Sequence, residues 1–133
     1  MKLVLVRYGE YTDGHLNEQG RRTMTLVSGR LKSVVQNAKV CIICANIPRA
    51  IESAEIITKE FNAEPAQSFT ELYAAEENGV GINLDTALKI IDTAGQGKDV
   101  VVAIISREYI QAISKHFGGP DAILKRGEIL ELP

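Results

Sequence analysis

Three short, uninterrupted apolar runs constrain the fold more than any other feature of this sequence. They occupy residues 3–6, 40–44 and 100–105, and β-branched side chains are frequent in them. A strand that is apolar at every position, rather than at alternate positions, is typical of a parallel sheet covered on both faces. The runs therefore predict an α/β domain whose central strands are fully buried.

Helical patterns separate these runs. Asn17 is a good N-cap for the first helix, and Pro48 suits the first turn of the second. The expected helices span residues 18–35, 48–61, 83 or 85 to 91, and 108–117. With weaker strands near residues 66–69 and 129–132, this order predicts a three-layer α/β/α sandwich around a mostly parallel sheet. No linker or repeat interrupts the pattern, so we expect residues 1–133 to form a single domain.

The charge balance limits the kinds of partner. The chain has 15 Lys and Arg against 17 Asp and Glu, a formal net charge of −2. A dedicated nucleic-acid binder or anionic-membrane binder would normally carry a basic excess, so we expect neither partner. No apolar stretch approaches the ~20 residues of a membrane span, and no signal-peptide core follows the N-terminus. We therefore expect a cytoplasmic protein.

The two cysteines form a C-x-x-C pattern inside the second apolar run. Cys41 and Cys44 lack the helix N-terminus that would lower a thiol pKa, so we expect buried, reduced thiols. No second pair of Cys or His residues completes a metal site, and the two histidines cannot form a zinc site alone. The sequence predicts no metal and no cofactor.

An arginine stands close to the end of each major predicted strand. These residues are Arg7, Arg49 and Arg107. Because ligands of such sheets collect beyond the carboxyl ends of the strands, the three side chains could form a local cationic pocket. Arginine forks match phosphate oxygens bidentately, so the expected ligand is phosphate or a phosphorylated molecule. The alternative is three ordinary surface arginines with their stems packed on the sheet edge.

Four segments in order resemble the motifs of the histidine phosphatase (phosphoglycerate mutase-like) superfamily. Residues 3–10 resemble its opening, in which R-H-G follows the first strand. Residues 16–20 resemble L-[ST]-x-x-G, residues 44–54 resemble S-S-P-L-x-R-A-x-x-T-A, and residues 105–110 resemble V-S-H-x-x-x-I. In size the chain is most similar to the small bacterial phosphohistidine phosphatases. The resemblance implies a phosphoglycerate mutase-like fold.

The departures from the family pattern fall at its chemistry. In the family, the His of R-H-G attacks phosphorus, and the His of V-S-H helps to bind and stabilise the phosphoryl group. Tyr8 and Arg107 occupy these positions here. The resemblance assigns phosphate binding to Arg7 and Arg49, and Arg107 can join them as a third cation. Glu71 lies where the family often has an acidic proton donor, although a solvated carboxylate at a helix start is the alternative.

These residues favour a catalytically degenerate member of the family. A phenol has an ordinary pKa of about 10, against about 6.5 for imidazole, so a tyrosine is a poor substitute for the attacking histidine at neutral pH. The expected function is binding of phosphate, a phosphorylated small molecule or a phosphoprotein in the arginine pocket. Enzymatic activity is left undecided: if present, it would be weak hydrolysis of a phosphomonoester or of phosphohistidine.

Two alternatives belong to other functional classes. One is an active phosphatase or phosphotransferase with altered machinery that uses Tyr8 or His15. The other is an assembly module with a relic pocket, in which apolar residues around Val80, Ile82 and 129–132 form a homodimer surface.

Overall fold

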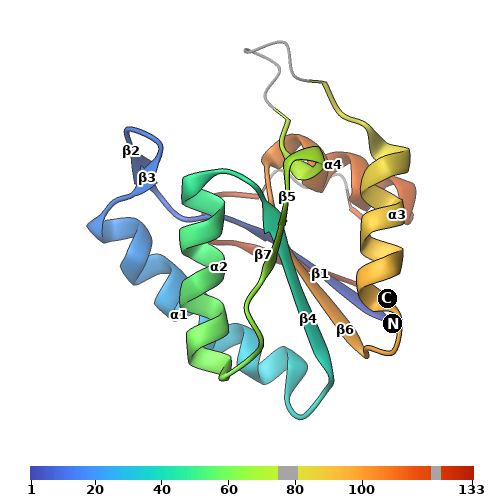
Figure 1. The fold of residues 1–133 in the computed structure, drawn as a ribbon, viewed down its shortest axis with the longest axis horizontal. Helices are drawn as coiled ribbons and strands as arrows, with labels where there is room; N and C mark the ends of the chain where they lie inside the picture. Colours follow the sequence, from blue (N-terminus) through green and yellow to red (C-terminus); the bar gives the residue numbers. More distant parts are fainter. Residues whose placement is uncertain (75–80, 121–123) are drawn as a thin grey trace.

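The computed structural model describes residues 1–74, 81–120 and 124–133, and it contains a five-stranded sheet between helices (Figure 1). The strands are β1 (Lys2–Arg7), β4 (Val40–Ala45), β5 (Gln67–Phe69), β6 (Val100–Ile105) and β7 (Ile129–Leu132). Their order across the sheet is β5-β4-β6-β1-β7. All neighbours are parallel except β7, which runs antiparallel to β1 at one edge. The mostly parallel sheet predicted from the sequence is confirmed.

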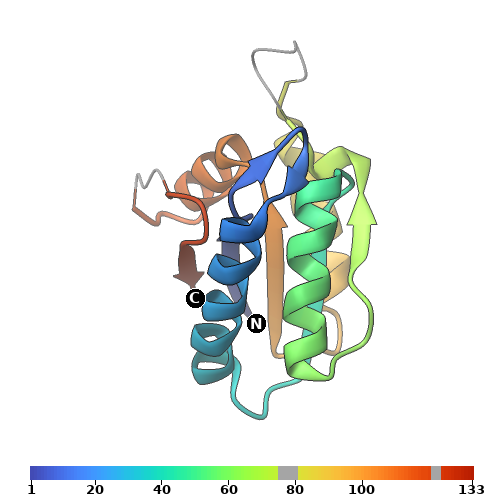
Figure 2. The same cartoon turned by 90° about the vertical axis from the view of Figure 1, so that its left-hand side faces the viewer.

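Two pairs of helices cover the two faces of this sheet. Helices α1 (Glu18–Val35) and α2 (Pro48–Phe61) lie together on one face, as Figure 2 shows with that face toward the viewer. Helices α3 (Leu84–Gly95) and α4 (Arg107–His116) cover the other face (Figure 1). The first two helices have the predicted bounds. Helix α3 continues four residues beyond the expected Ile91, and α4 begins and ends one residue earlier than expected.

The core forms where the apolar runs meet both helical layers. All six residues of β6 are buried, as are Leu3, Val4, Leu5 and Val6 of β1. Residues of these two strands pair in register from Lys2 with Val100 to Arg7 with Ile105. The carboxyl ends of both strands therefore lie side by side at one edge of the core.

The two thiols differ in their surroundings. Cys44 is buried, as expected, and burial raises its pKa to about 11. Cys41 is only partly buried, contrary to the expectation, because it lies at the amino end of β4, where the first two residues of the strand are both partly exposed. Both cysteines are free thiols.

A small hairpin follows β1 and was not predicted. Strands β2 (Tyr11–Thr12) and β3 (His15–Leu16) pair antiparallel, so His15 lies in a short strand. Asp13 and Gly14 form the turn with φ values of 54° and 84°. Two positive φ angles are what a type I′ turn requires, and Asp-Gly is a preferred pair for it. The hairpin projects at the carboxyl end of the sheet, beside the start of α2 (Figure 2).

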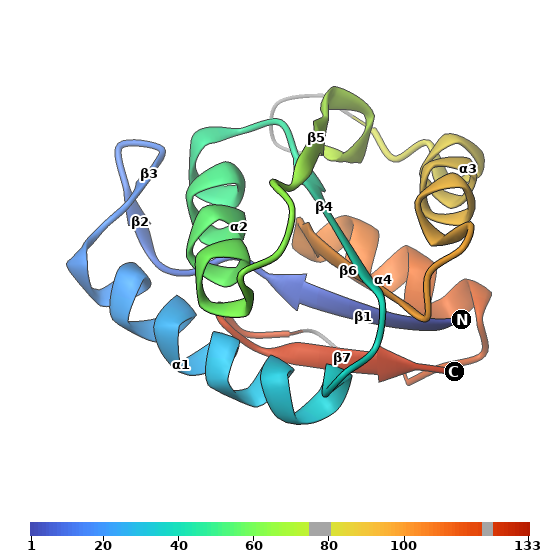
Figure 3. The same cartoon turned by 60° about the horizontal axis from the view of Figure 1, so that its bottom comes forward.

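The two chain termini lie at the end of the sheet opposite to the hairpin. Strand β7 brings Leu132 against Leu3, so the two termini lie close together (Figure 3). Of the apolar residues considered for a homodimer surface, Leu132 is buried against the sheet and Ile82 is 38% exposed. Val80 lies outside the described residues. Among the residues that are described, no helix is long and apolar enough to cross a membrane.

Candidate functional site

The three arginines predicted from the strand ends lie around one cavity. Arg7 is the last residue of β1, Arg49 lies in the first turn of α2, and Arg107 begins α4. The cavity has a volume of about 170 Å³. Its described lining consists of Arg7, Tyr8, Tyr11, Arg49, Ala74, Arg107, Glu108 and Arg126. The topology thus gathers residues that are up to 119 positions apart, counting from Arg7 to Arg126.

Positive charge dominates this cavity. Its described lining includes four arginines and one carboxylate, that of Glu108. The nearest approach of that carboxylate to Arg107 is 3.5 Å, between Oε1 and Nη2, at the limit of a hydrogen bond. The pKa of Arg7 is lowered by burial and by the charges of Arg126 and Arg107, although Tyr8 and Glu108 act to raise it. The arginines therefore repel one another in this structure.

Two arginines of the cavity each have a buried guanidinium nitrogen without a partner among the described residues. Arg7 donates from Nη1 to the carbonyl of Leu124 at 2.7 Å. The Nε atoms of Arg7 and Arg49 are buried and have no hydrogen-bond partner in the described parts of the chain. Buried polar groups are normally satisfied, so such orphans need an explanation. An anionic ligand in the cavity would supply the missing negative charge beside these guanidinium groups.

Two tyrosines form the aromatic side of the cavity. The rings of Tyr8 and Tyr11 meet edge to face with centroids 5.9 Å apart. The Cζ atom of Arg49 lies 5.0 Å from the Tyr8 centroid and 4.3 Å from the Tyr11 centroid. Burial acts to lower the pKa of Arg49, but the phenol groups of Tyr8, Tyr11 and Tyr73 outweigh it and raise that pKa. Tyr8 itself is 6% exposed, so the tyrosine is enclosed by its neighbours.

The sequence reasoning missed Tyr11 and Arg126. Tyr11 reaches the cavity because the hairpin folds back, and the Asp13-Gly14 turn was the signal that could have revealed it. Arg126 lies just before β7, outside every motif. Its Cζ atom is 4.8 Å from the Tyr11 centroid. No local pattern marks such a residue, since its position depends on the antiparallel return of the chain to β1.

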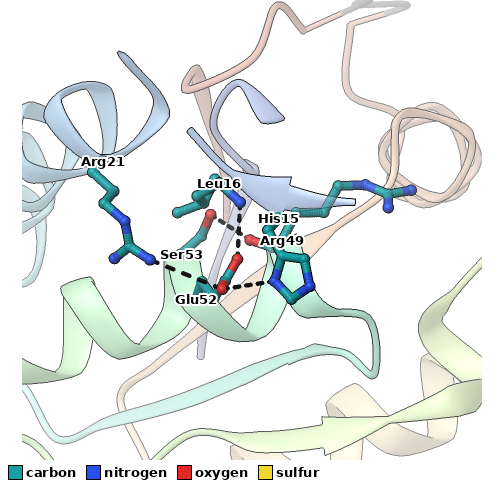
Figure 4. A network of polar contacts seen from close by, with 6 residues as sticks. All are labelled: His15, Leu16, Arg21, Arg49, Glu52 and Ser53. Carbon is teal, nitrogen blue, oxygen red and sulfur yellow. Dashed lines mark hydrogen bonds and ion pairs between the residues drawn. The ribbon is translucent and has the colours of Figure 1, made fainter. Parts of the chain in front are cut away.

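A carboxylate of α2 anchors the hairpin that carries Tyr11 (Figure 4). Glu52 accepts a hydrogen bond from the backbone N–H of Leu16 at 2.8 Å through Oε1. Its Oε2 lies 3.0 Å from Nδ1 of His15 and 3.9 Å from Nη2 of Arg21. Burial acts to raise the pKa of Glu52, but the contacts with His15 and Leu16 outweigh it and lower that pKa. Because Leu16 pairs with Tyr11, this carboxylate also helps to hold Tyr11 in place.

The neighbouring residue ties α2 to the loop after Tyr8. The Ser53 hydroxyl donates to the carbonyl of Arg49 at 2.8 Å and accepts from the backbone N–H of Gly9 at 3.3 Å. In Figure 4 the side chain of Arg49 extends away from this network, while its carbonyl takes part in it. The backbones that carry Tyr8 and Arg49 are thereby held together.

Two further candidates lie outside the described lining of the cavity. The His15 side chain is 62% exposed and contacts Glu52 on the hairpin. Glu71 is exposed in the short helix η1 (Thr70–Leu72), and its backbone carbonyl accepts a hydrogen bond from the Tyr109 hydroxyl at 2.8 Å. Within residues 1–74, 81–120 and 124–133, no cluster of three or more His, Cys, Asp or Glu side chains could hold a metal ion.

Comparison with known families decides the classification. The family model described as histidine phosphatase superfamily (branch 1) matches residues 4–79, more than half of the chain. The chain belongs to the histidine phosphatase superfamily. This membership, and the phosphoglycerate mutase-like fold that goes with it, confirm the resemblance and the fold class drawn from the four motifs. No curated protein matches the chain.

Solved structures share the fold at low sequence identity. The protein histidine phosphatase SixA complexed with tungstate matches with a TM-score of 0.80 and 15% identity, over 98% of this chain and 86% of that one. The putative phosphohistidine phosphatase SixA from Agrobacterium tumefaciens gives a TM-score of 0.74 and 14% identity, over 98% and 89%. Phosphoglycerate mutase from Plasmodium falciparum gives 0.67 and 20%, over 90% and 70%. At these identities the likeness is one of fold.

Proposed function

We propose that this protein is a catalytically degenerate histidine phosphatase domain that binds phosphate or a phosphorylated ligand through Arg7, Arg49 and Arg107. The observation that carries the proposal is the cavity in which four arginines face a single described carboxylate. The ligand class is a phosphorylated small molecule or a phosphoprotein. Such a ligand would neutralise the excess positive charge of the described lining.

The geometry suits a tetrahedral oxyanion. Each of the three arginines comes from a different element, so their guanidinium groups approach one space from separate directions. Guanidinium groups bind phosphate oxygens with two parallel N–H donors, and such charge-assisted bonds are stronger than neutral ones. Two of the three, Arg107 and Arg49, stand at the first turn of a helix, where the helix dipole also favours negative charge.

The residues at the reactive positions support loss of the family's chemistry. Tyr8 follows Arg7 where the R-H-G motif has histidine, and Arg107 follows Ser106 where V-S-H has histidine. Neither a guanidinium nor a protonated phenol is a useful nucleophile toward phosphorus at neutral pH. His15 contacts Glu52 outside the described lining of the cavity, which makes it a poor replacement.

Named relatives fit the same ligand class. One structural neighbour is the protein histidine phosphatase SixA complexed with tungstate, which is a tetrahedral oxyanion like phosphate. Another is phosphoserine phosphatase from Entamoeba histolytica in complex with 3-phosphoglyceric acid. We extend to this chain the binding of a phosphate-like group, and not the reactions of these enzymes.

A second candidate function follows from the position of Tyr8. Its side chain lines the cavity beside Arg49, so a phosphotransferase or phosphatase using the phenol oxygen is the competing proposal. Turnover of p-nitrophenyl phosphate and of phosphohistidine by the unaltered protein and by Tyr8→Phe separates the two. Activity that disappears in Tyr8→Phe would favour the second proposal, whereas no turnover by either protein favours the first.

Isothermal titration calorimetry tests the main proposal. Phosphate and vanadate should bind to the unaltered protein, and Arg7→Ala should weaken both by at least about tenfold, because a charged hydrogen-bond donor is lost. Arg22→Ala is the matched control, since Arg22 is an exposed arginine of α1 paired with Glu18 at 3.0 Å. Circular dichroism melts show whether the variants are folded. Absence of binding, or equal affinity in Arg7→Ala and the unaltered protein, would refute the proposal.

A further inference from the structure

Arg126 is a fourth cation of the cavity that the family motifs do not explain. It enters from the segment before β7, while the other three arginines lie at or just after the carboxyl ends of β1, β4 and β6. Burial is the largest cause of the lowered pKa of Arg7, and the charge of Arg126 lowers it further, although Tyr8 acts to raise it. The guanidinium groups of Arg126 and Arg7 therefore repel one another. In the described parts of the chain it forms no ion pair within 4 Å. Within the described residues, no ion pair therefore compensates its charge.

The contact of Arg126 with Tyr11 leaves its donors available. Its Cζ atom lies 4.8 Å from the ring centroid, so the guanidinium group contacts the aromatic face. A cation–π contact is not a hydrogen bond, so it does not by itself occupy the N–H donors of the guanidinium group. Arg49 contacts the same ring with its Cζ atom at 4.3 Å. Tyr11 therefore holds two guanidinium groups at one side of the cavity.

The described lining of the cavity carries more positive charge than one phosphate group neutralises. The described lining has an excess of three positive charges, from four arginines and Glu108. A phosphate monoester carries about −1.5 to −2 near neutral pH. Two adjacent phosphate groups bring more negative charge and more acceptor oxygens to the same space. The cavity has a volume of about 170 Å³.

We propose that Arg126 forms a second anion position beside the one made by Arg7, Arg49 and Arg107, so that the cavity prefers a ligand with two adjacent phosphate groups. This inference rests on the proposed function and narrows its ligand to a diphosphate. The first phosphate group occupies the position between the three strand-end arginines. The second contacts Arg126 on the Tyr11 side.

Calorimetry with inorganic phosphate and inorganic diphosphate tests the inference, at constant ionic strength and without divalent cations. We expect diphosphate to bind at least about tenfold more tightly than phosphate, or about 1.4 kcal/mol. Arg126→Gln keeps most of the stem against Tyr11 but removes the charge, so it should abolish this preference and change phosphate affinity less than about threefold. Arg126 is exposed, so the substitution should leave the fold intact.

Two further variants make the comparison specific. Arg126→Lys keeps the charge but loses the planar donor pair, so part of the preference should remain. Arg30→Gln removes an equal charge from an exposed position on α1, outside the described lining of the cavity, and should leave both affinities unchanged. A loss of preference in Arg30→Gln as large as in Arg126→Gln would show a general charge effect and overturn the inference.

The outcomes separate this inference from the proposed function. Phosphate binding with no preference for diphosphate, or equal weakening of both ligands by Arg126→Gln, overturns the inference and leaves the proposed function standing. Absence of binding by either ligand overturns both. A comparison of ADP with AMP identifies the source of the diphosphate group. A preference for ADP supports a diphosphate ester, and a preference limited to inorganic diphosphate supports the free ion.

Discussion

The two ends of the central sheet each carry a cavity, but the cavities differ in size and in charge. At the amino end of β4 and β6, a cavity of about 570 Å³ is lined by Lys32, Lys39 and Lys98 together with Glu60 and Glu64. Lys32 and Glu60 approach to 3.7 Å between Nζ and Oε2. At the carboxyl end, the cavity of about 170 Å³ has four arginines against one described carboxylate. Charge imbalance therefore marks the candidate site, whereas size does not.

Helix orientation explains why the two sets of cations have different consequences. Helices α1 and α2 end near the larger cavity, and their last turns contain Lys32 and Lys59. A helix C-terminus carries partial negative charge, so basic residues there are compensated by the fold itself. Helices α2 and α4 begin at the smaller cavity, where Arg49 and Arg107 add to a partial positive charge. Of these two cavities, the smaller one has the charge imbalance among its described residues that an external anion would neutralise.

The largest expected effect is a gain of catalytic activity in the smaller cavity, at the carboxyl end of the sheet. Tyr8→His alone should leave the protein nearly inactive, because the second histidine position still holds Arg107. Tyr8→His combined with Arg107→His should raise hydrolysis of p-nitrophenyl phosphate on the order of 10²-fold above background. This is well short of the roughly 10⁶-fold effect of an attacking residue in a working enzyme. Steady-state assays with the purified proteins measure the gain.

The same two substitutions also test whether the rest of the cavity is still fit for catalysis. Arg107→His alone serves as the matched control and should show no gain, because Tyr8 remains. If the double variant folds, binds phosphate and still shows no turnover, the cavity has diverged at further positions. The two cavities would then differ in phosphate binding, but the smaller cavity would not retain the arrangement of residues that catalysis needs.

The next largest effect is on phosphate affinity, and it is measured by removing one cation from each of the two cavities. Arg49→Ala removes a guanidinium group that contacts Tyr8 and Tyr11, and we expect phosphate affinity to fall between about tenfold and a hundredfold. Lys98→Ala removes a cation from the larger cavity and should change the affinity by less than about twofold. Calorimetry measures both variants. Similar losses in the two variants would mean that phosphate responds to overall charge, and the contrast between the cavities would be wrong.

Much of this fold could be predicted because its elements are locally encoded. The continuous apolar runs predicted β1, β4 and β6, and the caps at Asn17 and Pro48 predicted the starts of α1 and α2. Asn17 accepts a hydrogen bond from the Gly20 N–H at 2.9 Å through its side chain, as a capping residue should. These features depend on a few neighbouring residues, so the sequence is sufficient to identify them.

The candidate site was only partly predictable because its parts are far apart in the chain. The rule that ligands collect at strand ends located Arg7, Arg49 and Arg107 near one another. It could not locate Arg126, whose place depends on how β7 returns beside β1. Nor could it locate Tyr11, which depends on the hairpin that Glu52 anchors. Partners in tertiary contacts leave no periodic or spacing signal in one sequence.

Removing the carboxylate that anchors the β2–β3 hairpin should have a smaller effect on phosphate binding in the cavity at the carboxyl end of the sheet. Glu52→Gln weakens the contacts with Leu16 and His15, so we expect phosphate affinity to fall about threefold and stability by about 1 kcal/mol. Urea denaturation measures the second quantity. Glu18→Gln is the matched control, because Glu18 pairs with Arg22 on the exposed side of α1 and should have little effect on either quantity.

The pH dependence of the stability difference between the unaltered protein and Glu52→Gln tests whether the charge of Glu52 causes that difference. The pKa of Glu52 lies below its usual value because the contacts with His15 and Leu16 outweigh the effect of burial. A carboxylate of this kind adds stability above its ordinary pKa of about 4.3, and that stability is lost as the pH falls through the folded-state value. The gap between the unaltered protein and Glu52→Gln should therefore shrink below about pH 4. A gap that is constant with pH would assign the effect to packing instead.

The smallest expected effect concerns the pH dependence of stability, and it compares Cys44 and Cys41 near the two ends of β4. Burial raises the pKa of Cys44, near the carboxyl end of β4, to about 11, while Cys41 near the amino end is partly exposed. A raised pKa means that stability is present below the ordinary thiol pKa, and is lost as the pH rises toward the folded-state value. Between about pH 9 and 11 the unaltered protein should therefore lose more stability than Cys44→Ala, by on the order of 1 kcal/mol or less. Burial also raises the pKa of the partly buried Cys41, so Cys41→Ala should remove a smaller part of this pH dependence than Cys44→Ala in urea denaturation over the same range. If Cys41→Ala removed as much of the pH dependence as Cys44→Ala, the two ends of β4 would be equally open to solvent.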